Sequence, residues 1–590
     1  MCFVLVRICL IRYAPSMEKQ WHLLNPDPET IRALSHQLQC SPLIARLLAI
    51  RGIRSKFQAT RFLHPSLNSL TPPLELAGMD DAVQRIQRAL VNDEKILVFG
   101  DYDADGITAT AALTAFLRYC GARISYYIPH RIVDGYGLGT EFIKNRAIPA
   151  GIDLIITADC GSESSDAVSL ARQAGIHTIV TDHHPIAQLP SDAIAVINPT
   201  RPECHANLAH LAGVGVAFYL IIALRTHLRK TGIWKHRREP NLKRLCDLVA
   251  VGTIADVAPL IGENRALTTA GLQQINQSAR PGIAALMRMS GSPDTPTDAE
   301  AIAFKLAPRL NAAGRLVHAR MACELLLTEN RQKATHLAKA LCRLNNRRQS
   351  MERDLLELIQ DRLTHLPGQI DRPVLVIDGN HWHEGILGIV ASRLTRQFNR
   401  PAVVISSRNG RGKGSARSID GIDLSAALKQ CSDLLDRFGG HPLAAGLSLH
   451  TSNIAAFKSR LESIVGQMAA DRDVQPTLSI DAHVPLDNIT PELMDNLERL
   501  EPFGQGNPYP LFMDNEVRVH TAKTVGDRHL QMVLESGSGN GGKYPAIQFN
   551  ATGEQLRMDR IKKIAYRPQW NYWNGRKSLQ LLVEETDPGS

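Results

Sequence analysis

The chain has 590 residues, of which 44% are hydrophobic and 21% are charged; 67 Lys and Arg against 58 Asp and Glu give a formal net charge of +9. This length is too great for one hydrophobic core and predicts roughly three or four domains, and the composition excludes collagen-like and fully disordered chains. The positive charge favours a polyanionic partner, while the cysteines form no CxxC pair and so do not support a zinc ribbon or a thioredoxin-type site.

The first residues of the chain resemble neither a membrane span nor a secretory signal. Residues 1–15 are apolar, but Arg7 and Arg12 interrupt them. We interpret residues 1–16 as a mis-assigned start or a disordered segment, with Met17 as the alternative initiator. Because no other run is long enough to cross a bilayer and scattered cysteines suit a reducing compartment, we expect a cytoplasmic protein without membrane contact. We expect it to be a monomer.

Short helices are predicted over residues 17–92, among them 41–52, where Ser41 is a candidate N-cap, and 80–92. From residue 93 to residue 330, short apolar runs alternate with helical stretches, which predicts βαβ units and a buried parallel sheet. The expected strands are 95–99, 124–128, 153–157, 176–181 and 194–197, and the expected helices are 108–119, 166–174, 214–230 and 241–254.

Three further segments complete the chain. Residues 331–366 contain few helix breakers and predict one long connecting helix. Residues 367–470 predict a second, smaller α/β domain, and residues 471–590 predict a small β-barrel. The strands expected in this barrel are 516–521, 529–535, 546–550, 561–567 and 577–584. The fold class is therefore α/β, with a C-terminal OB-like β-barrel.

The strongest local signal is the segment GDYDADG, in which Asp101, Asp103 and Asp105 follow a predicted strand. Three carboxylates so close together repel one another unless cations neutralise them, and hard oxygen ligands suit Mg²⁺ or Mn²⁺. A solvated acidic turn is the simpler alternative. An EF-hand loop is excluded, because its twelfth position would be Ala112 instead of Glu and a strand leads into it.

Other acidic and imidazole side chains follow later strands of the same predicted sheet. Asp159 follows the strand 153–157, Asp182-His183-His184 follow the strand 176–181, and Asp256 ends a helix. The carboxyl ends of parallel strands meet at one edge, so we expect these side chains to gather there. Carboxylates and imidazoles together predict a site for two metal ions that hydrolyses phosphate esters or anhydrides. A pair of structural or solvent-facing histidines is the alternative.

Two segments nearer the C-terminus could contact phosphates or bases. Residues 412–417 (GKGSAR) offer backbone N–H groups and an arginine to an anion, but Ser407 stands where a Walker A motif needs glycine, so ATP use is not implied. In the predicted barrel, aromatic residues interleaved with basic ones could stack bases or could form the barrel core. The aromatic residues are Tyr566, Trp570, Tyr572 and Trp573, and the basic ones are Lys562, Lys563, Arg567 and Arg576.

The motifs DYDADG, ADCG, TDHH and GTIADVAPL, in this order, resemble the DHH phosphoesterase superfamily. The match is closer to its RecJ family of single-stranded-DNA-specific exonucleases, through segments that include RIVDGYGL, GVGVAFY, PRLNAAGRL, WHEGILGIVASRL, KGSARSI and FGGHPLAAGLSL. The resemblance covers nearly the whole chain from Gly52. It implies a DHH domain over residues 93–330, a DHHA1-like domain over 367–470 and an OB-like domain over 471–590.

The resemblance also implies roles for the matched residues. Family metal ligands match Asp103, Asp105, Asp159, His183 and Asp256. Three neighbours in the same motifs are expected to be ligands or to support ligands, namely Asp101, Asp182 and His184. The positions near the scissile phosphate match Arg309, Asn311, Arg315 and His441, and those that hold the 5′ end or its phosphate match Arg131, Ser415, Arg417 and Ser418. We expect Asp101, Asp103, Asp105, His183 and His184 to take part in catalysis.

The activity that the resemblance implies is 5′→3′ hydrolysis of single-stranded DNA to mononucleotides in recombination and repair, with two Mg²⁺ or Mn²⁺ ions. It also implies a single-strand-binding protein and a RecQ-type helicase as partners. One alternative is another superfamily activity on short RNA, cyclic dinucleotides or pyrophosphate, but those proteins generally lack the OB-like unit. The other is a non-catalytic DNA-binding scaffold that resembles RecJ, which the complete set of carboxylates and histidines argues against.

Overall fold

The computed structural model describes residues 19–186, 188–235, 237–291, 295–365, 368, 370–470, 476–526, 529–537, 542–549, 551, 559–573 and 576–587. The interpretation of residues 1–16 and of Met17 as the start lies outside these residues. Within them, no helix combines the length and the apolar character that crossing a bilayer requires.

The first domain is built on a five-stranded parallel sheet in the order β3-β2-β4-β5-β6. Side chains alternate across it, so Ile96 and Val98 enter the core on one face while Leu97 and Phe99 enter the core on the other. Burial on both faces explains why four of these strands are largely apolar runs, whereas the edge strand β3 is exposed or half-buried along its length. They are β2 (Lys95–Gly100), β3 (Arg123–Tyr127), β4 (Leu154–Ala158), β5 (His177–Thr181) and β6 (Ala195–Ile197).

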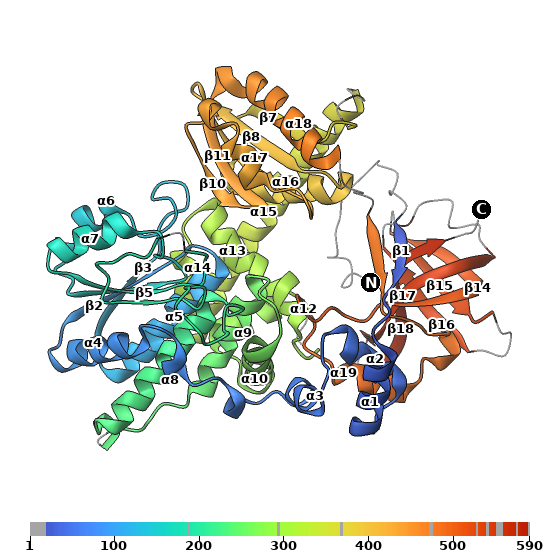
Figure 1. The fold of residues 1–590 in the computed structure, drawn as a ribbon, viewed down its shortest axis with the longest axis horizontal. Helices are drawn as coiled ribbons and strands as arrows, with labels where there is room; N and C mark the ends of the chain where they lie inside the picture. The colour runs from blue at the N-terminus through green and yellow to red at the C-terminus, as the bar shows by residue number, and fades with distance from the viewer. Residues whose placement is uncertain are drawn as a thin grey trace.

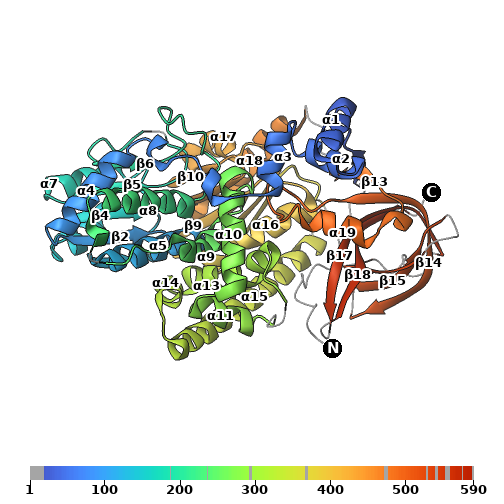
Figure 2. The same cartoon turned by 90° about the horizontal axis from the view of Figure 1, so that it is seen from below.

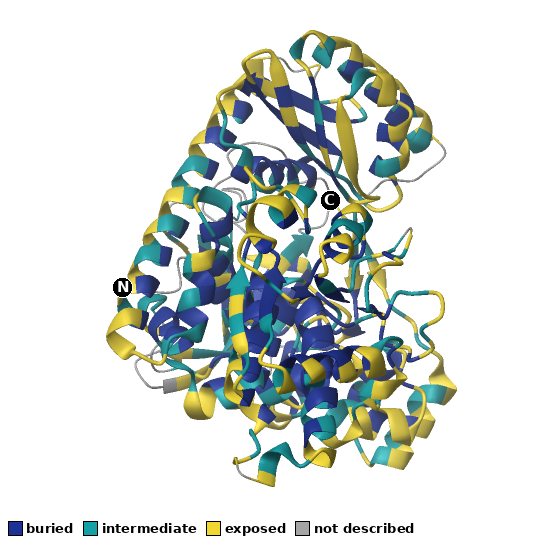
Figure 3. Cartoon of the chain, turned by 90° about the vertical axis from the view of Figure 1, so that its left-hand side faces the viewer, coloured by how far each residue is buried: buried dark blue, intermediate teal, exposed yellow. Residues whose placement is uncertain are grey.

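Helices cover both faces of this sheet (Figure 1). One face carries α4 (Met79–Val91), α5 (Ala104–Cys120) and α8 (Gly213–Lys230), and the other carries α6 (Thr140–Phe142) and α7 (Ser165–Gln173). Further helices enlarge the first core, in which burial is dense (Figure 3). These are α9 (Cys246–Ala255), α10 (Gly262–Ser278), α11 (Pro281–Met289), α12 (Ala299–Ala301), α13 (Ala307–Leu316) and α14 (Arg320–Leu327).

The predicted connecting helix is α15 (Arg331–His365), a single helix of 35 residues. Its first half contributes Leu337 and Leu341 to the core of the first domain, whereas its second half contributes Leu355 and Ile359 to the core of the second. The helix therefore joins the two domains by packing into both of them.

The second domain has a five-stranded mixed sheet in the order β10-β11-β9-β8-β7, in which only β7 and β8 pair in parallel. Its strands are β7 (Leu375–Asn380), β8 (Ala402–Arg408), β9 (Arg411–Arg417), β10 (Arg437–His441) and β11 (Ala444–His450). One face packs on α15 and α16 (Glu384–Phe398), and the other packs on α17 (Leu424–Lys429) and α18 (Ile454–Ala470).

The C-terminal domain is a closed five-stranded barrel, because β14 pairs with β17 as well as with β15. It lies at the end of the molecule away from α7 (Figure 2). The barrel strands are β14 (Phe512–Val525), β15 (His529–Glu535), β16 (Lys543–Gln548), β17 (Arg560–Trp573) and β18 (Arg576–Asp587). Next to it lie β12 (Thr477–Ile480), β13 (Ala482–His483) and α19 (Pro491–Glu498).

The N-terminal segment divides between two cores instead of forming a unit of its own. Helix α4 packs on the first domain, but Leu34, Leu47 and Ala59 from the preceding helices share one core with Phe512 of the barrel. The helices are α1 (Pro28–Leu38), α2 (Pro42–Ile50) and α3 (Lys56–Leu63), and β1 (Gln20–Leu23) pairs in parallel with β12. The N-cap prediction is confirmed, because the Ser41 hydroxyl accepts a hydrogen bond from Ile44 N at 3.3 Å.

A buried arginine of α10 joins the first domain to this combined N- and C-terminal unit. Arg265 donates hydrogen bonds to Phe62 O at 2.7 Å, to Glu501 O at 2.6 Å and to Pro502 O at 3.3 Å. Its guanidinium also lies 3.8 Å from the centre of the Phe62 ring. One side chain from the first domain thus satisfies carbonyls from two segments at opposite ends of the chain.

Candidate metal centre and its surroundings

The parallel sheet brings acidic side chains from three neighbouring strands to one edge, as predicted. Asp101 follows β2, Asp159 follows β4 and Asp182 follows β5, and all three are almost fully buried. Two backbone hydrogen bonds extend the sheet past the strand ends, from Asp101 N to Ala158 O at 3.2 Å and from Asp159 N to Thr181 O at 2.9 Å. Asp159 also has a positive φ of 65°, a conformation in which non-glycine residues are uncommon.

The helix that follows β2 starts earlier than the sequence suggested. We expected it at residue 108, with the acidic residues in a loop, but α5 begins at Ala104 and Asp103 is its N-cap. The Asp103 carboxylate accepts hydrogen bonds from Asp105 N at 3.0 Å and Gly106 N at 3.1 Å. The prediction failed because acidic residues resemble a loop, although they are favoured in the first turn of a helix, near its positive end.

Asp105 lies where α5, α8 and α9 meet, and tight packing around it requires glycines. Its two carboxylate oxygens accept hydrogen bonds from Gly213 N at 2.7 Å and Val214 N at 2.9 Å, at the start of α8. A Cβ atom on Gly213 would lie 2.3 Å from Asp159 Oδ1, and one on Gly252 would lie 2.7 Å from Asp105 Oδ1. Both glycines belong to motifs that the sequence singled out, but their role is visible only in the structure.

The two histidines reach the same place from the loop after β5. His183 Nε2 lies 3.2 Å from Asp159 Oδ1, 3.9 Å from Asp256 Oδ2 and 4.0 Å from Asp105 Oδ2. Asp256, the C-cap of α9, therefore joins the cluster from a helix end, as predicted. The His183 and His184 rings lie 4.5 Å apart in an edge-to-face arrangement.

Asp182 serves mainly to hold this loop. One of its oxygens lies 2.7 Å from His184 Nδ1 and accepts hydrogen bonds from the backbone N–H groups of His183 and His184, at 2.8 and 3.2 Å. The other accepts a hydrogen bond from Ser162 N at 3.0 Å. The sequence left open whether Asp182 is a ligand or a support for ligands, and these contacts favour the supporting position.

The arrangement of the cluster fits divalent cations. Three overlapping groups each bring their candidate ligand atoms within 4.8 Å of one another, and Asp159 and His183 are shared between groups. Among the described residues, Asp101 Oδ1, Asp159 Oδ1 and His183 Nε2 are buried without a hydrogen-bond partner, which is costly unless another ligand occupies them. The groups are Asp159-His183-His184, Asp105-His183-Asp256 and Asp101-Asp103-Asp159.

The electrostatics of the cluster indicate the same need for positive charge. Burial and the neighbouring carboxylates raise the pKa of Asp105 to about 7 and that of Asp256 to about 8, and they raise the pKa of Asp159 well above its usual value. Burial lowers the pKa of His183 to about 4, which keeps the ring neutral, as a metal ligand must be. Ions of charge +2 would let these carboxylates stay ionised at neutral pH.

Helix α13, which contains the motif PRLNAAGRL, contacts the start of α5. The Asn311 side-chain oxygen accepts a hydrogen bond from Ala104 N at 2.8 Å. A Cβ atom on Gly314 would lie 2.3 Å from Tyr102 O, so the two segments touch through their backbones. Asn311 thus reaches the acidic segment, where it holds the helix that presents Asp103 and Asp105.

Three of the predicted phosphate-contacting arginines come together from separate elements. Arg131 follows β3, Arg315 lies in α13 and Arg417 ends β9 of the second domain. Burial, followed by the charges of Arg131, Arg348 and Arg417, lowers the pKa of Arg315 to about 10, so these cations are near neighbours. The guanidinium of Arg131 lies 4.8 Å from the centre of the Tyr102 ring, beside the acidic cluster. Gathered arginines of this kind suit an anionic ligand.

The remaining predicted residues are less clearly placed for chemistry. Arg309 donates a hydrogen bond to Lys305 O at 2.5 Å, and Ser418 donates one to Ile422 O at 2.8 Å. Ser415 lies in the middle of β9, paired with Val404 of β8. His441 is exposed at the end of β10, and among the described residues it forms no recorded hydrogen bond or ion pair with the acidic cluster.

The aromatic residues of the barrel differ in burial, so the two alternatives, base stacking and a place in the barrel core, have to be decided residue by residue. Tyr566 is fully buried and donates a hydrogen bond to Val484 O at 2.6 Å, so the suggestion that it stacks bases is wrong. Trp570 is partly buried, with Lys577 Nζ 4.3 Å from the centre of its ring, whereas Tyr572 is 44% exposed. The side chain of Trp573 lies outside the described residues.

One further residue near the cluster was not predicted. Tyr136, in the loop before α6, places its hydroxyl 3.2 Å from His184 Nδ1, and its ring lies 5.7 Å from the His184 ring. Burial, followed by the nearby carboxylates, raises its pKa far above the usual range, so the hydroxyl stays protonated. The sequence signal was only its place in RIVDGYGL, a motif from which we selected Arg131 alone.

Comparison with known proteins agrees with this geometry. Three family models match successive parts of the chain: the DHH family N-terminal domain at residues 95–253, the DHHA1 domain at 371–467 and the RecJ OB domain at 480–585. The chain is 38% identical to the single-stranded-DNA-specific exonuclease RecJ of Salmonella typhimurium, over 97% of this chain and all of the relative. It is 35% identical to that of Bacillus subtilis, over 96% of this chain and 70% of the relative.

A solved structure extends this likeness to three dimensions. The crystal structure of RecJ in complex with Mn²⁺ from Thermus thermophilus superposes with a TM-score of 0.82 at 31% identity, and the match covers 97% of this chain and 80% of that one. The likeness thus extends over the parallel-sheet domain, the second α/β domain and the closed barrel, and the chain belongs to the RecJ family.

Proposed function

We propose that the protein is a metal-dependent exonuclease that hydrolyses single-stranded DNA from the 5′ end and releases mononucleotides. The observation that carries this proposal is the cluster of Asp, His and unpaired buried ligand atoms at the edge of the first sheet, next to gathered arginines. Its relatives carry the name single-stranded-DNA-specific exonuclease, and solved RecJ structures contain Mn²⁺ or Mg²⁺. The domains we propose are residues 93–330, 367–470 and 471–590.

We assign the metal ions, Mg²⁺ or Mn²⁺, to Asp103, Asp105, Asp159, His183 and Asp256, with Asp101 as a further candidate ligand. When bound, two such ions would neutralise charge on the scissile phosphate and lower the pKa of a water molecule. The chain itself fixes the ligands. The backbone N–H groups of α8 orient the Asp105 carboxylate, and burial keeps the imidazole of His183 neutral.

Two protonated side chains beside the ligands, His184 and Tyr136, can donate hydrogen bonds to the substrate. Burial alone would lower the pKa of His184, but the hydrogen bond and charge of Asp182 raise it to about 9. His184 is therefore cationic at neutral pH and attracts a phosphate, while Asp182 fixes the orientation of its ring. The Tyr136 hydroxyl, protonated beside His184, offers a further hydrogen-bond donor.

The arginines set the end from which the strand is degraded. In our proposal Arg131 and Arg417, assisted by Ser415 and Ser418, hold the 5′-terminal phosphate, and Arg309, Arg315 and His441 contact the backbone near the scissile bond. Burial and the charge of Asp103 raise the pKa of Asp101 well above its usual value, and the positive charge of Arg131 partly opposes this rise. A 5′ phosphate at these arginines would place the first phosphodiester bonds over the carboxylates.

The test is degradation of single strands labelled at either end, with Mn²⁺, by the parent chain and by Asp103→Asn. Asparagine is as good an N-cap as aspartate, so this variant removes the charge and keeps the start of α5. Asp354→Asn, an exposed carboxylate of α15, is the matched control. We expect mononucleotides from the 5′ end with the parent and the control, and a rate at least about 100-fold lower with Asp103→Asn.

The other assignments are tested by other outcomes of the same assay. Degradation of short RNA, cyclic dinucleotides or pyrophosphate in preference to long single strands would contradict the nuclease proposal. Retained DNA binding without any hydrolysis by the parent chain would instead support a binding scaffold. We also propose that the protein acts in the cytoplasm as a monomer in recombination and repair, with a single-strand-binding protein and a RecQ-type helicase as partners.

A further inference from the structure

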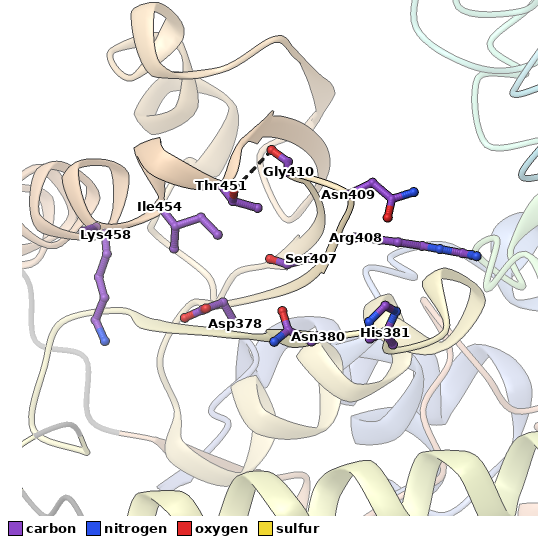
Figure 4. A pocket seen from close by; sticks show the side chains of 11 residues that line it. Asp378, Asn380, His381, Ser407, Arg408, Asn409, Gly410, Thr451, Ile454 and Lys458 are labelled. Carbon is purple, nitrogen blue, oxygen red and sulfur yellow. Dashed lines mark hydrogen bonds between the residues drawn. The ribbon is translucent and has the colours of Figure 1, made fainter.

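The second domain contains a polar cavity of about 700 Å³ that is built from other residues than the acidic cluster (Figure 4). It lies at the carboxyl ends of the parallel strands β7 and β8, on the face of the sheet that α18 covers. In open α/β sheets, ligands bind in the crevice outside the carboxyl ends of parallel strands. The volume is in the range of sites for small ligands.

A buried hydroxyl without a partner points into this cavity. Ser407, the residue before the last one of strand β8, is only 8% exposed, and its Oγ forms no hydrogen bond with any described residue. Figure 4 shows this hydroxyl directed to the middle of the space, above Asn380. The sheet holds the backbone at this point, because Ser407 pairs with Asn380 and Ser407 O accepts a hydrogen bond from His381 N at 3.1 Å. A buried polar atom of this kind calls for a partner from solvent or from a ligand.

One end of the cavity is suited to an anion. Arg408, His381 and Asn409 line this end, where the Arg408 side chain extends outward from the space (Figure 4). Arg408 is exposed and, within the part of the chain that the structure describes, takes part in no ion pair. An arginine with a neighbouring histidine and amide supplies the donors that a phosphate group accepts.

The other end combines a cation, a carboxylate and an apolar wall. Lys458 and Ile454, from the first turns of α18, lie across from Asp378 (Figure 4). This helix has 17 residues, and its positive N-terminal end faces the cavity. A carboxylate in such a position accepts hydrogen bonds from a sugar hydroxyl or a base amino group, whereas Ile454 offers a surface for a flat ring.

We propose that this cavity binds a mononucleotide, with its phosphate at Arg408 and His381, its sugar against the Ser407 hydroxyl and its base between Ile454 and Asp378. Only the choice of a nucleotide among phosphate esters rests on the proposed function, since mononucleotides are what the acidic cluster would release. The cavity is therefore a second nucleotide site, carried by the second domain.

The experiment is calorimetric titration of the full chain with dTMP in EDTA, which keeps metal ions from holding the phosphate at the acidic cluster. The chain carries Arg417→Ala to weaken the arginine group beside that cluster. Adding Arg408→Ala and Lys458→Ala removes both cations of the cavity, while Arg411→Ala, an exposed arginine of β9 that does not line it, is the matched control. Loss of a charge-assisted hydrogen bond weakens binding about ten- to a hundredfold.

A second variant tests whether dTMP needs the open volume of the cavity, independently of the cavity's charged side chains. Ala455 is an exposed residue of α18 that lines the cavity, and Ala455→Trp places a large side chain in that space. We expect dTMP binding to weaken at least tenfold in this variant and in the double alanine variant, at an unchanged melting temperature. We expect no change in the Arg411→Ala control.

Three results would overturn the proposal. These are equal dTMP affinity with and without the cavity substitutions, inorganic phosphate binding as tightly as dTMP, and binding of oligonucleotides but not of dTMP. Thymidine alone should bind more weakly than dTMP. Nuclease activity is measured in parallel on the cavity variants with Arg417 restored, so that a failure of the nucleotide site is distinguishable from a failure of the proposed function.

Discussion

Removing the metal ions should make the stability of the fold fall as the pH rises, and Asp256 should account for a measurable part of that fall. Without cations, burial and the negative charges of Asp105 and Asp103 raise the pKa of Asp256 from 3.8 to about 8. The folded state then holds the proton more tightly than the unfolded chain does. The stability that this provides is fully present below pH 3.8 and is lost as the pH rises through about 8.

The size of the effect follows from this shift. Each pH unit between the unfolded and folded pKa values removes up to about 1.4 kcal/mol per group. Between pH 6.5 and pH 8, Asp256 therefore contributes a loss of about 2 kcal/mol. Asp105, with its pKa raised to about 7, and His184, with its pKa raised to about 9, act in the same direction. The opposite contribution of His183, whose pKa is lowered from 6.5 to about 4, levels off above pH 6.5 and adds little there.

The assay is urea unfolding at pH 6.5, 7, 7.5 and 8, in EDTA and in Mn²⁺, for the parent chain and Asp256→Asn. In EDTA the free energy of unfolding should fall with pH, and the fall should be about 2 kcal/mol smaller in Asp256→Asn. Mn²⁺ at about 100 times its Kd should add about 3 kcal/mol per ion and should abolish the fall in the parent. A parent chain whose stability stays level or rises with pH in EDTA would refute the reasoning, as would an unchanged slope in the variant.

Three other substitutions test separate parts of the structure. Asn311→Ala leaves the buried Ala104 N–H without its acceptor, so we expect a loss of about 1–3 kcal/mol in urea unfolding together with lower nuclease activity. Arg265→Met removes the donors to three backbone carbonyls and should cost about 3 kcal/mol or more, while proteolysis between the first domain and the barrel becomes faster. Arg417→Ala should make the dependence of single-strand affinity on log salt shallower by about 0.7, with Arg411→Ala as the unchanged control; equal slopes would remove Arg417 from the DNA contacts.

Four strands of the first domain were predictable because they are buried on both faces, whereas the edge strand β3 is exposed or half-buried along its length. In runs such as Lys95–Gly100 and Leu154–Ala158, apolar residues therefore follow one another without alternating polar residues, and the strand is easy to recognise in the sequence. In the barrel, the strand 529–535 was predicted with the observed bounds of β15, whereas the other four strands were predicted too short. All residues of β14 (Phe512–Val525) beyond its first half are exposed or half-buried, so the apolar signal ends before the hydrogen bonding does. The N-terminal helices were expected, but an apolar helix face does not reveal which distant segment will cover it.

The chemistry-bearing side chains were predictable for a related reason. Sheet topology determines which strand ends are neighbours, so Asp101, Asp159 and Asp182 could be placed together from their positions after strands. What the sequence did not reveal is the close backbone packing around them. The glycines at the starts or in the middle of helices, such as Gly213 and Gly252, show their importance only through the atoms that a Cβ would meet. Tyr136 was missed because an uncharged loop residue carries no electrostatic signal.

The shared core of α1–α3 and the barrel has a consequence for synthesis of the chain on the ribosome. Leu34 and Leu47 are made early, but Phe512 and Val583, which lie in the same core, are made last. The parallel-sheet domain can assemble while translation continues, whereas the first helices must wait, with apolar faces uncovered, until the final strands emerge. Chains that stop before the barrel should therefore aggregate through these helices, and removing residues 19–63 from such chains should restore their solubility.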